Sequence, residues 1–486
     1  MGALRGNGVG KDILIFSDGT GQFGGLKPDQ RLSNVYKMYR AMRPGPESPI
    51  RYTDQIAYYN PGLGAGEVQG RSFRRIRNFL AAAVGTGIDD NIMDCYTAIM
   101  QYYEPGDRVL LFGFSRGAYT VRSLANVMHL CGVPTRMPDW SALPPSGLRL
   151  RRIARDAVKS VYGHGAGMAR DRQPYLEQRL EKGRRFRAAY GSEPPPDEEN
   201  IRGNVQPDFI GVFDTVAALD NAAVSRAFGL AVTSLFALAW VSQEEQWPAW
   251  TTIMLAVLGG FGALWFLGLL ASQIRFFEPD PAHPLRWYRP WDWPRILKYT
   301  HFARWSRKNY DRWLDETVGH ARHALSIDEN RADFAQVDWF AYRDLPEHHV
   351  SQPPWLEQVW FAGCHSDIGG SYLELESRLS DIALQWMVAE LERCRPGIRV
   401  RHDILHTSPD PLGQQHEERV FEKIGAIAFK WRVRPRTVDP AQPLHPSVIA
   451  RLEADQVPHP DAMRPYRPEP LRHHPQARKY YSGKDR

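Results

Sequence analysis

Cysteine is scarce in this sequence, and the four cysteines of the 486-residue chain form no C-x-x-C pair. This absence argues against a disulfide framework and against a structural zinc site, because both need cysteines at short, recurring spacings. The pattern suits a reducing compartment. A chain of this length can bury enough hydrophobic surface to be stable without covalent cross-links.

The sequence also lacks the usual signals for export, nucleotide binding and nucleic-acid binding. Residues 1–11 are polar and glycine-rich, so we expect no signal peptide. The glycine-rich segment 61–66 lacks the Lys-Ser/Thr ending of a phosphate-binding P-loop. The net charge of +6 is mild for a protein of this size, and we expect no nucleic-acid partner.

Apolar, strand-like runs alternate with helix-compatible segments in the first half of the chain. Residues 12–16, 56–59, 109–112 and 208–213 are typical of buried strands, and segment 91–100 is typical of a helix. Such alternation predicts an α/β protein with a mostly parallel sheet flanked by helices.

The segment Gly113-Phe114-Ser115-Arg116-Gly117 stands where the third of these strands gives way to a predicted helix. G-x-S-x-G at such a junction is typical of a nucleophile elbow, in which the glycines leave room for a strained backbone at the serine. We therefore predict Ser115 as a nucleophile. The alternative is an ordinary turn.

Two further residues follow strand-like runs and complete a candidate Ser-His-Asp triad. Asp214 ends the run at 208–213, and His365 follows the run at 358–362. Ligands of parallel sheets bind beyond the carboxyl ends of the strands, and the order Ser, Asp, His matches the α/β-hydrolases. We predict Asp214 as the acid that orients the histidine and His365 as the general base, with His323 in reserve. A helix N-cap is the alternative role for Asp214.

Acyl transfer at this site would also need hydrogen-bond donors for an oxyanion. We expect them from the backbone N–H groups of Arg116 and of the turn formed by Asp18, Gly19 and Thr20, although Asp18 could instead brace that turn. Segment 319–334 looks helix-compatible and would place His320 and His323 on one face, without enough partners for a metal site. No metal or organic cofactor is expected, with calcium near the acidic turns left open.

Two uncharged apolar runs, 227–241 and 251–271, predict an inserted helical hairpin within residues 222–300. The second run is long enough to cross a bilayer, which takes about 20 residues. Arginines flank the pair and Glu244 and Glu245 lie between the runs, so the positive-inside rule places the catalytic parts in the cytoplasm at a bacterial inner membrane. The alternative is a pair of buried helices or a hydrophobic lid. Aromatic residues typical of membrane interfaces surround the runs: Trp240, Trp247, Trp250, Trp287, Tyr288, Trp291 and Trp293.

The rest of the chain is divided by its composition. Hydrolase segments are expected at 1–221 and 301–395, and a Pro/Arg/His-rich extension of irregular structure at 396–486. A basic insertion lies within 136–200, where residues 149–187 hold twelve Lys or Arg and four acidic residues. It is either a solvated helical face or a surface for anionic lipid headgroups, and the neighbouring apolar hairpin favours lipid contact.

Five sequence blocks stand out along the chain: Ser17-Asp-Gly-Thr20, Gly113-Phe-Ser-Arg-Gly-Ala-Tyr119, Gly211-Val-Phe-Asp-Thr-Val216, His323-Ala-Leu-Ser-Ile-Asp-Glu-Asn-Arg331 and Trp360-Phe-Ala-Gly-Cys-His-Ser-Asp-Ile-Gly-Gly370. In this order they resemble the α/β-hydrolase family that includes the catalytic domains of type VI secretion phospholipase effectors. The resemblance covers about residues 11–220 and 318–395, with one departure at Ser371, where a further glycine is usual after Gly370.

This resemblance implies an esterase that acts on phospholipids, with Ser115 as nucleophile, Asp214 as acid and His365 as base. We therefore predict a serine-dependent lipid ester hydrolase at a membrane. The alternatives are a carboxylesterase for other substrates with a hydrophobic lid, an inactive membrane-anchored interaction module, and, for location, a secreted effector.

Overall fold

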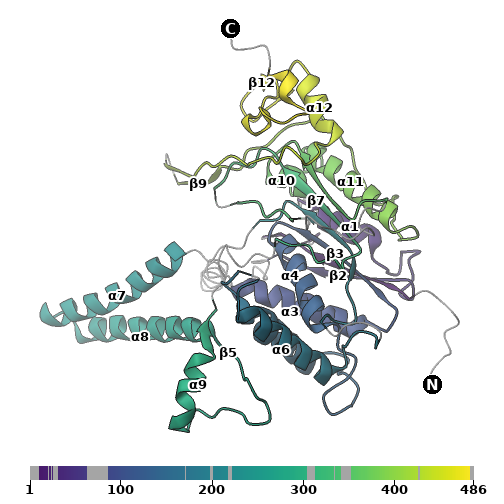
Figure 1. Cartoon of the computed structure of the whole chain (residues 1–486). Helices are drawn as coiled ribbons and strands as arrows, with labels where there is room; N and C mark the ends of the chain where they lie inside the picture. Colours follow the sequence, from purple (N-terminus) through teal and green to yellow (C-terminus); the bar gives the residue numbers. More distant parts are fainter. Residues whose placement is uncertain are drawn as a thin grey trace.

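The core of the computed structural model is a parallel β-sheet with helices on both faces (Figure 1). Thr20 and residues 63–66 of the glycine-rich segment lie outside the part of the chain that the structure describes. That part comprises residues 10–19, 21–22, 24–25, 31–62, 86–169, 171–196, 201–216, 222–303, 312–332, 334–340, 352–424 and 427–481.

The sheet has six strands in the order β2-β1-β3-β4-β7-β8, and every neighbouring pair is parallel. The predicted fold class, a mostly parallel sheet flanked by helices, is therefore confirmed. Because the strands are parallel, their carboxyl ends meet at one edge of the sheet. The strands are β1 (Asp12–Ser17), β2 (Gln55–Asn60), β3 (Arg108–Phe114), β4 (Pro207–Phe213), β7 (His320–Ser326) and β8 (Leu356–Phe361).

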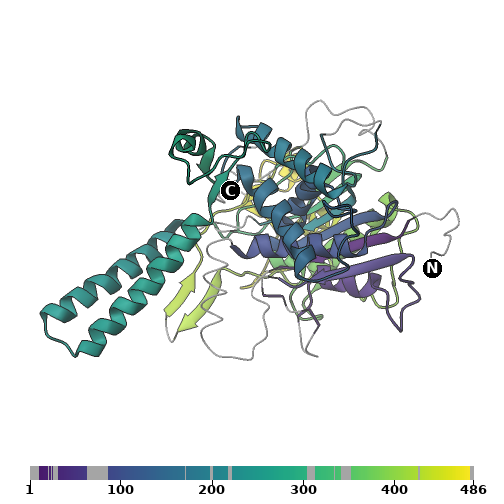
Figure 2. The ribbon, with the colours of Figure 1, turned by 90° about the horizontal axis from the view of Figure 1, so that it is seen from below.

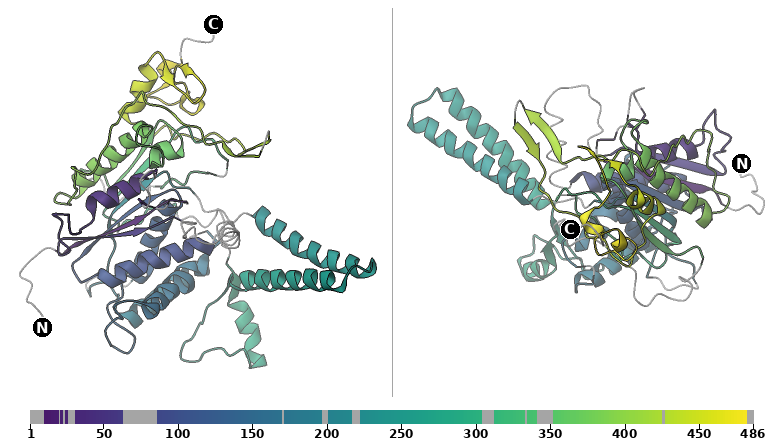
Figure 3. Two further views of the ribbon diagram at one scale, coloured as in Figure 1. Left: turned by 180° about the vertical axis from the view of Figure 1, so that it is seen from behind. Right: turned by 90° about the horizontal axis from the view of Figure 1, so that it is seen from above.

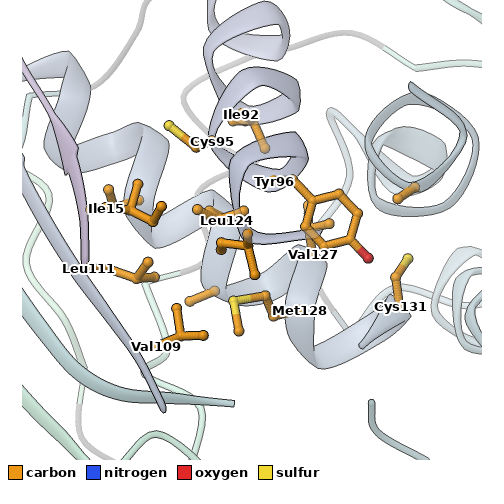
Figure 4. Packing of buried hydrophobic residues seen from close by; sticks show 14 of the residues in the cluster. Ile15, Ile92, Cys95, Tyr96, Val109, Leu111, Leu124, Val127, Met128 and Cys131 are labelled. Atoms are coloured by element: carbon orange, nitrogen blue, oxygen red, sulfur yellow. The ribbon is translucent and has the colours of Figure 1, made fainter. Parts of the chain in front are cut away.

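Successive strand residues point to opposite faces of the sheet, so each strand feeds two hydrophobic cores. In β1, Ile13 and Ile15 enter one core and Leu14 and Phe16 the other. Figure 4 shows the first core, where residues of β3 pack against Leu124 and its neighbours in α4. α3 (Thr86–Tyr102) and α4 (Arg116–Cys131) cover the first face, and α1 (Asn34–Met42) and α11 (Arg378–Cys394) cover the second.

The segment that holds His320 and His323 is a strand, β7, and our expectation of a helix there was wrong. β7 is buried at six of its seven positions, yet Arg322, His323 and Ser326 are polar. Its sequence therefore shows neither the alternation of a half-buried strand nor a continuous apolar run, and it can be mistaken for a helix. In a strand, residues three apart lie on opposite faces, so the two histidines do not share one.

The two apolar runs form antiparallel helices that project from the sheet domain (Figures 1, 2 and 3). Small residues let them pack closely, since a Cβ at Gly262 would lie 2.9 Å from Val232 Cγ2. The side chains of Phe261 and Leu264 remain 71% and 69% exposed. Among the described helices, one is long and apolar enough to cross a membrane, and it covers Ala249–Gly268. The helices are α7 (Ala222–Glu244) and α8 (Ala249–Ala271), followed by the ribbon of β5 (Ile274–Phe276) and β6 (Thr300–Phe302), with α9 (Trp293–Lys298) between these two strands.

Several basic side chains of residues 149–187 are paired within the fold. Arg184 and Arg185 both contact Glu181 at 2.7 Å, and Arg151 forms an ion pair with Asp94. These pairs favour a helical surface with internal ion pairs over a headgroup-binding surface. The segment contains α5 (Leu148–Arg155), a π-helix (Asp156–Val161), a 3-10 helix (Tyr162–Gly165) and α6 (Tyr175–Tyr190).

The C-terminal extension has its own core and packs along the edge strand β8. Trp360 of β8 is fully buried there together with Val448 and Tyr466, and its backbone N–H donates to the carbonyl of Pro443 at 3.0 Å. The extension is thus less irregular than the sequence suggested. Its regular elements are the ribbon of β9 (Val420–Ile424) and β10 (Ile427–Lys430), α12 (Pro446–Glu453), and the short pair β11 (Val457–Pro458) and β12 (Met463–Arg464).

Candidate active site

Ser115 lies in the sharp turn between β3 and α4, with φ 58° and ψ −122°. Its N–H donates to the carbonyl of Phe213 at 3.1 Å, which fixes the turn to the end of β4. The flanking glycines are required by space, because a Cβ at Gly113 would lie 2.6 Å from Ala118 Cα and one at Gly117 would lie 2.1 Å from the Ser17 carbonyl oxygen. The strained serine and the two crowded glycines are the geometry of a nucleophile elbow.

Replacing Gly117 with alanine is expected to lower the free energy of unfolding by more than about 2 kcal/mol, because the new methyl group meets backbone that cannot move aside. Gly45→Ala is the matched control, since no atom lies within 4 Å of the Cβ position there. Urea denaturation of both variants measures the difference. Equal midpoints would show that the elbow tolerates a side chain at residue 117.

Asp214 follows β4 directly and is completely buried, with φ 33°. One carboxylate oxygen, Oδ1, accepts from the Ser326 N–H at 3.1 Å. The other, Oδ2, lies 2.6 Å from His365 Nδ1 and accepts from Arg436 Nη2 at 2.9 Å. Burial alone would raise the pKa of Asp214, but the Arg436 guanidinium and the His365 imidazole outweigh it and lower the pKa to about 2. The group is therefore a carboxylate at neutral pH.

His365 begins the short helix α10 (His365–Gly369), just after β8, and is almost completely buried. Its ring stacks on Phe114 with the centroids 4.6 Å apart, and Phe334 packs against it at 5.3 Å. When Nδ1 donates to Asp214, the neutral ring carries its lone pair at Nε2. His365 Nε2 is buried and has no hydrogen-bond partner among the described residues. The ring is thus oriented as a base needs to be.

The three predicted residues come together at the carboxyl edge of the sheet. Phe114, whose ring stacks on His365, immediately precedes Ser115, and the Ser115 carbonyl accepts from the Val216 N–H, two residues beyond Asp214, at 3.4 Å. No hydrogen bond joins Ser115 Oγ to His365 Nε2 in this structure. Such bonds are often long in ligand-free enzymes and tighten when the substrate binds.

The predicted oxyanion turn is already engaged in other hydrogen bonds. The Gly19 N–H donates to Asp18 Oδ1 at 2.7 Å, and the Asp18 N–H donates to the Asn60 carbonyl at 3.0 Å. Burial raises the pKa of Asp18 to about 6, although Ser33, Tyr59 and Gly19 donate to it. Asp18 therefore braces the turn. Among the predicted oxyanion donors that the structure describes, this leaves Arg116, at the first turn of α4, where helical N–H groups have no partner within the helix.

The reserve histidine, His323, occupies a different environment. Both of its ring nitrogens have partners: Nε2 accepts from the Thr215 N–H at 3.2 Å, and Nδ1 lies 3.3 Å from Gln358 Oε1. Burial, reinforced by the charge of Arg122, lowers its pKa to about 3. It remains neutral and supports the backbone beside Asp214. The described residues contain no group of three or more His, Cys, Asp or Glu side chains that could hold a metal ion.

Sequence reasoning missed two parts of the site. Ser326 and Glu329 stand in the block from His323 to Arg331, whose roles the sequence left unassigned; Ser326 supports Asp214, and Glu329 Oε2 accepts from the His365 N–H at 3.3 Å. That block had already been singled out in the sequence, so its polar residues could have been tested as parts of the site. No sequence pattern singles out Arg436, since it is one of many arginines in the extension.

A parallel α/β sheet with a serine elbow and a buried acid–histidine pair at its carboxyl edge defines the architecture of the α/β-hydrolases. The chain matches the family model described as "T6SS, Phospholipase effector Tle1-like, catalytic domain" over residues 11–253 and 286–390. This match covers more than half of the chain, and the protein belongs to that family. The resemblance inferred from the sequence is confirmed.

Individual relatives are more distant. The Saccharomyces cerevisiae "Uncharacterized protein YEL023C" is 34% identical over 131 residues, which cover 26% of this chain and 18% of that protein. A crystal structure of an uncharacterized protein from Pseudomonas aeruginosa is 15% identical with a TM-score of 0.33, covering 82% of this chain and 49% of its own. The structure of the Tle1 effector bound to the VgrG spike is 16% identical with a TM-score of 0.28, covering 77% and 53%. The chain thus spans about half of each solved structure and a smaller share of the yeast protein.

Proposed function

We propose that this protein is a serine-dependent lipid ester hydrolase of the phospholipase type, which acts at a membrane through Ser115, His365 and Asp214. The family description supports a phospholipase. The observation that carries the proposal is the His365–Asp214 contact of 2.6 Å, which leaves the buried Nε2 without a partner beside the serine elbow.

In the proposed reaction, Ser115 Oγ attacks the ester carbonyl carbon while His365 Nε2 takes its proton. Asp214 stabilises the imidazolium, and the Arg116 N–H donates to the oxyanion. The carbon–oxygen bond to the leaving alcohol then breaks, and the imidazolium returns the proton to that oxygen. Water, deprotonated by the same histidine, releases the fatty acid and restores Ser115.

The hairpin supports action at a membrane. α7 begins at Ala222, only eight residues after Asp214, so the hairpin starts close in sequence to the carboxyl edge of the sheet, where the candidate site lies. The 23 residues of α8 span about 35 Å, compared with a hydrocarbon core of about 30 Å. α9 lies near the base of the hairpin (Figures 1 and 3). Trp287 and Trp291, which precede α9 in the sequence, are 78% and 73% exposed, as residues of a membrane interface would be.

For location, the family of type VI secretion effectors supports the secreted alternative over residence in the inner membrane. The hairpin would then enter a bilayer only where the protein meets one. Its high exposure fits a segment whose apolar surface is covered by lipid.

The function is tested by offering the purified full chain phosphatidylglycerol in detergent micelles and, separately, a short-chain water-soluble ester. Release of fatty acid from the phospholipid at a rate at least comparable with that for the soluble ester is expected. Cleavage of the soluble ester alone would favour the carboxylesterase alternative. No cleavage of either substrate would favour the inactive interaction module.

A variant with Phe261→Glu and Leu264→Glu is expected to hydrolyse vesicle lipid at least about tenfold more slowly, because a charge inside a bilayer costs about 3 kcal/mol. Both side chains are exposed on α8, so the fold and the rate on a soluble ester should be unchanged. Leu148→Glu, at a residue 76% exposed outside the hairpin, is the control. Equal vesicle rates for the variant and the control would contradict membrane insertion.

A further inference from the structure

The C-terminal extension lies outside the segments that match the family, which end at residue 390, yet it reaches the candidate active site. Its residues 432–434 run along the segment that follows β7. The Ala332 N–H donates to the Arg432 carbonyl at 2.8 Å, and the Arg434 N–H donates to the Asn330 carbonyl at 2.7 Å. These backbone hydrogen bonds hold the extension in register beside the acid–histidine pair.

This register brings Arg436 onto Asp214. Arg436 is 7% exposed, and its Nη2 donates to Asp214 Oδ2, the same oxygen that lies 2.6 Å from His365 Nδ1. A second guanidinium nitrogen, Nη1, lies 3.5 Å from Gln336 Oε1, a distance at the limit for a hydrogen bond. One carboxylate oxygen is thus shared by a permanent cation and by the imidazole.

We propose that Arg436 is a positioning residue for the reaction, which holds the Asp214 carboxylate in place and sets the proton affinity of His365. This inference rests on the function proposed above. The guanidinium fixes Oδ2 so that the imidazole keeps one orientation, and its charge offsets part of the negative charge that would otherwise stabilise the imidazolium.

The charged groups around His365 show why the charge of Arg436 affects the imidazole. Three carboxylates interact with His365. Asp214, after β4, contacts its ring; Glu329, after β7, accepts a hydrogen bond from its backbone N–H; and Glu418, in the extension, interacts with it through its charge. Arg331 pairs with both Glu329 and Glu418, at 2.7 and 2.8 Å. Within α10 itself, Asp367 is paired with His416 of the extension at 2.7 Å. The aromatic rings of Phe114 and Phe334 contribute no charge.

Arg436 is therefore the cation that offsets Asp214, whereas Arg331 offsets the other two carboxylates. Without Arg436, the Asp214 charge acts on the imidazole alone and favours its protonated form. A protonated His365 cannot accept the Ser115 proton. Loss of Arg436 should thus move the acid limb of the pH profile to higher pH, by about one pH unit for a charge at this distance.

The test compares kcat/KM for a soluble ester from about pH 5 to about pH 9 in wild type, Arg436→Gln, Arg436→Lys and the control Arg434→Gln. Arg434 has an exposed side chain two residues away. Arg436→Gln should show its largest loss, about tenfold, on the acid limb and a smaller loss at high pH, where only the positioning of Asp214 is missing. Arg436→Lys should return most of the profile, and Arg434→Gln should match wild type.

Two results would overturn the inference while leaving the proposed function intact. One is a wild-type profile in Arg436→Gln. The other is an equal loss of rate at every pH that lysine does not restore, which would mean that Arg436 only stabilises the fold. Failure of the proposed function is distinct, because wild-type protein would then show no Ser115-dependent hydrolysis at all.

Discussion

Ser115→Ala is expected to lower kcat for phospholipid hydrolysis by about 10⁴-fold or more, because the variant has no oxygen to form the acyl-enzyme. Substrate binding should change little, since the hydroxyl contributes little to the apolar contacts of an acyl chain. The loss should therefore appear in kcat rather than in KM. Fatty-acid release from phosphatidylglycerol micelles measures it directly.

The fold should survive this substitution. Ser115 is held by backbone hydrogen bonds to Phe213 at the end of β4 and to Val216, which alanine retains, and the strained turn would lose only its hydroxyl. Ser141→Ala, at an exposed serine outside the site, is the control and should keep the wild-type rate. A Ser115→Ala variant with more than about a tenth of wild-type activity would require another nucleophile.

Asp214→Asn is the second substitution with a large expected effect, a loss of about 10⁴-fold in kcat. The Asn amide no longer fixes the tautomer with its lone pair at Nε2, and it has no charge to stabilise the imidazolium. A second consequence is that Arg436 is left buried without its carboxylate, so the free energy of unfolding should fall by about 3 kcal/mol or more.

The two effects can be separated. Activity is measured well below the denaturation midpoint of the variant, with Asp461→Asn, an exposed aspartate of the extension, as the control. Stability lost together with full activity per folded molecule would assign Asp214 a purely structural role. In that case Glu329, whose carboxylate accepts from the His365 backbone, would be the next acid to test.

The parts of the candidate site that the sequence indicates are those encoded locally. The elbow at Ser115 combines a strand, two crowded glycines and a helix within a short stretch. Asp214 follows β4 directly, and His365 lies four residues after the end of β8. The parallel sheet follows from the alternation of such segments. These signals need no knowledge of which segments meet in space.

The other parts could not be predicted from local patterns, and the clearest case is a contact between distant segments. The Asp214–Arg436 contact joins residues 222 positions apart, and no local pattern distinguishes Arg436 from its neighbours. β7 lacks the alternation of a half-buried strand because both of its faces are covered. The sequence left two roles open for the turn at Asp18, an oxyanion donor or a turn braced by its own aspartate, and the hydrogen bond from the Gly19 N–H to Asp18 Oδ1 favours the second.

The most direct test of the account is to treat the purified protein with a fluorophosphonate and locate the adduct by peptide mass spectrometry. We predict one modified residue, Ser115, and almost no labelling in a His365→Ala variant, because the imidazole activates the serine. Labelling of a different serine, or lipid hydrolysis that continues with Ser115 unmodified, would contradict the assignment of the active site.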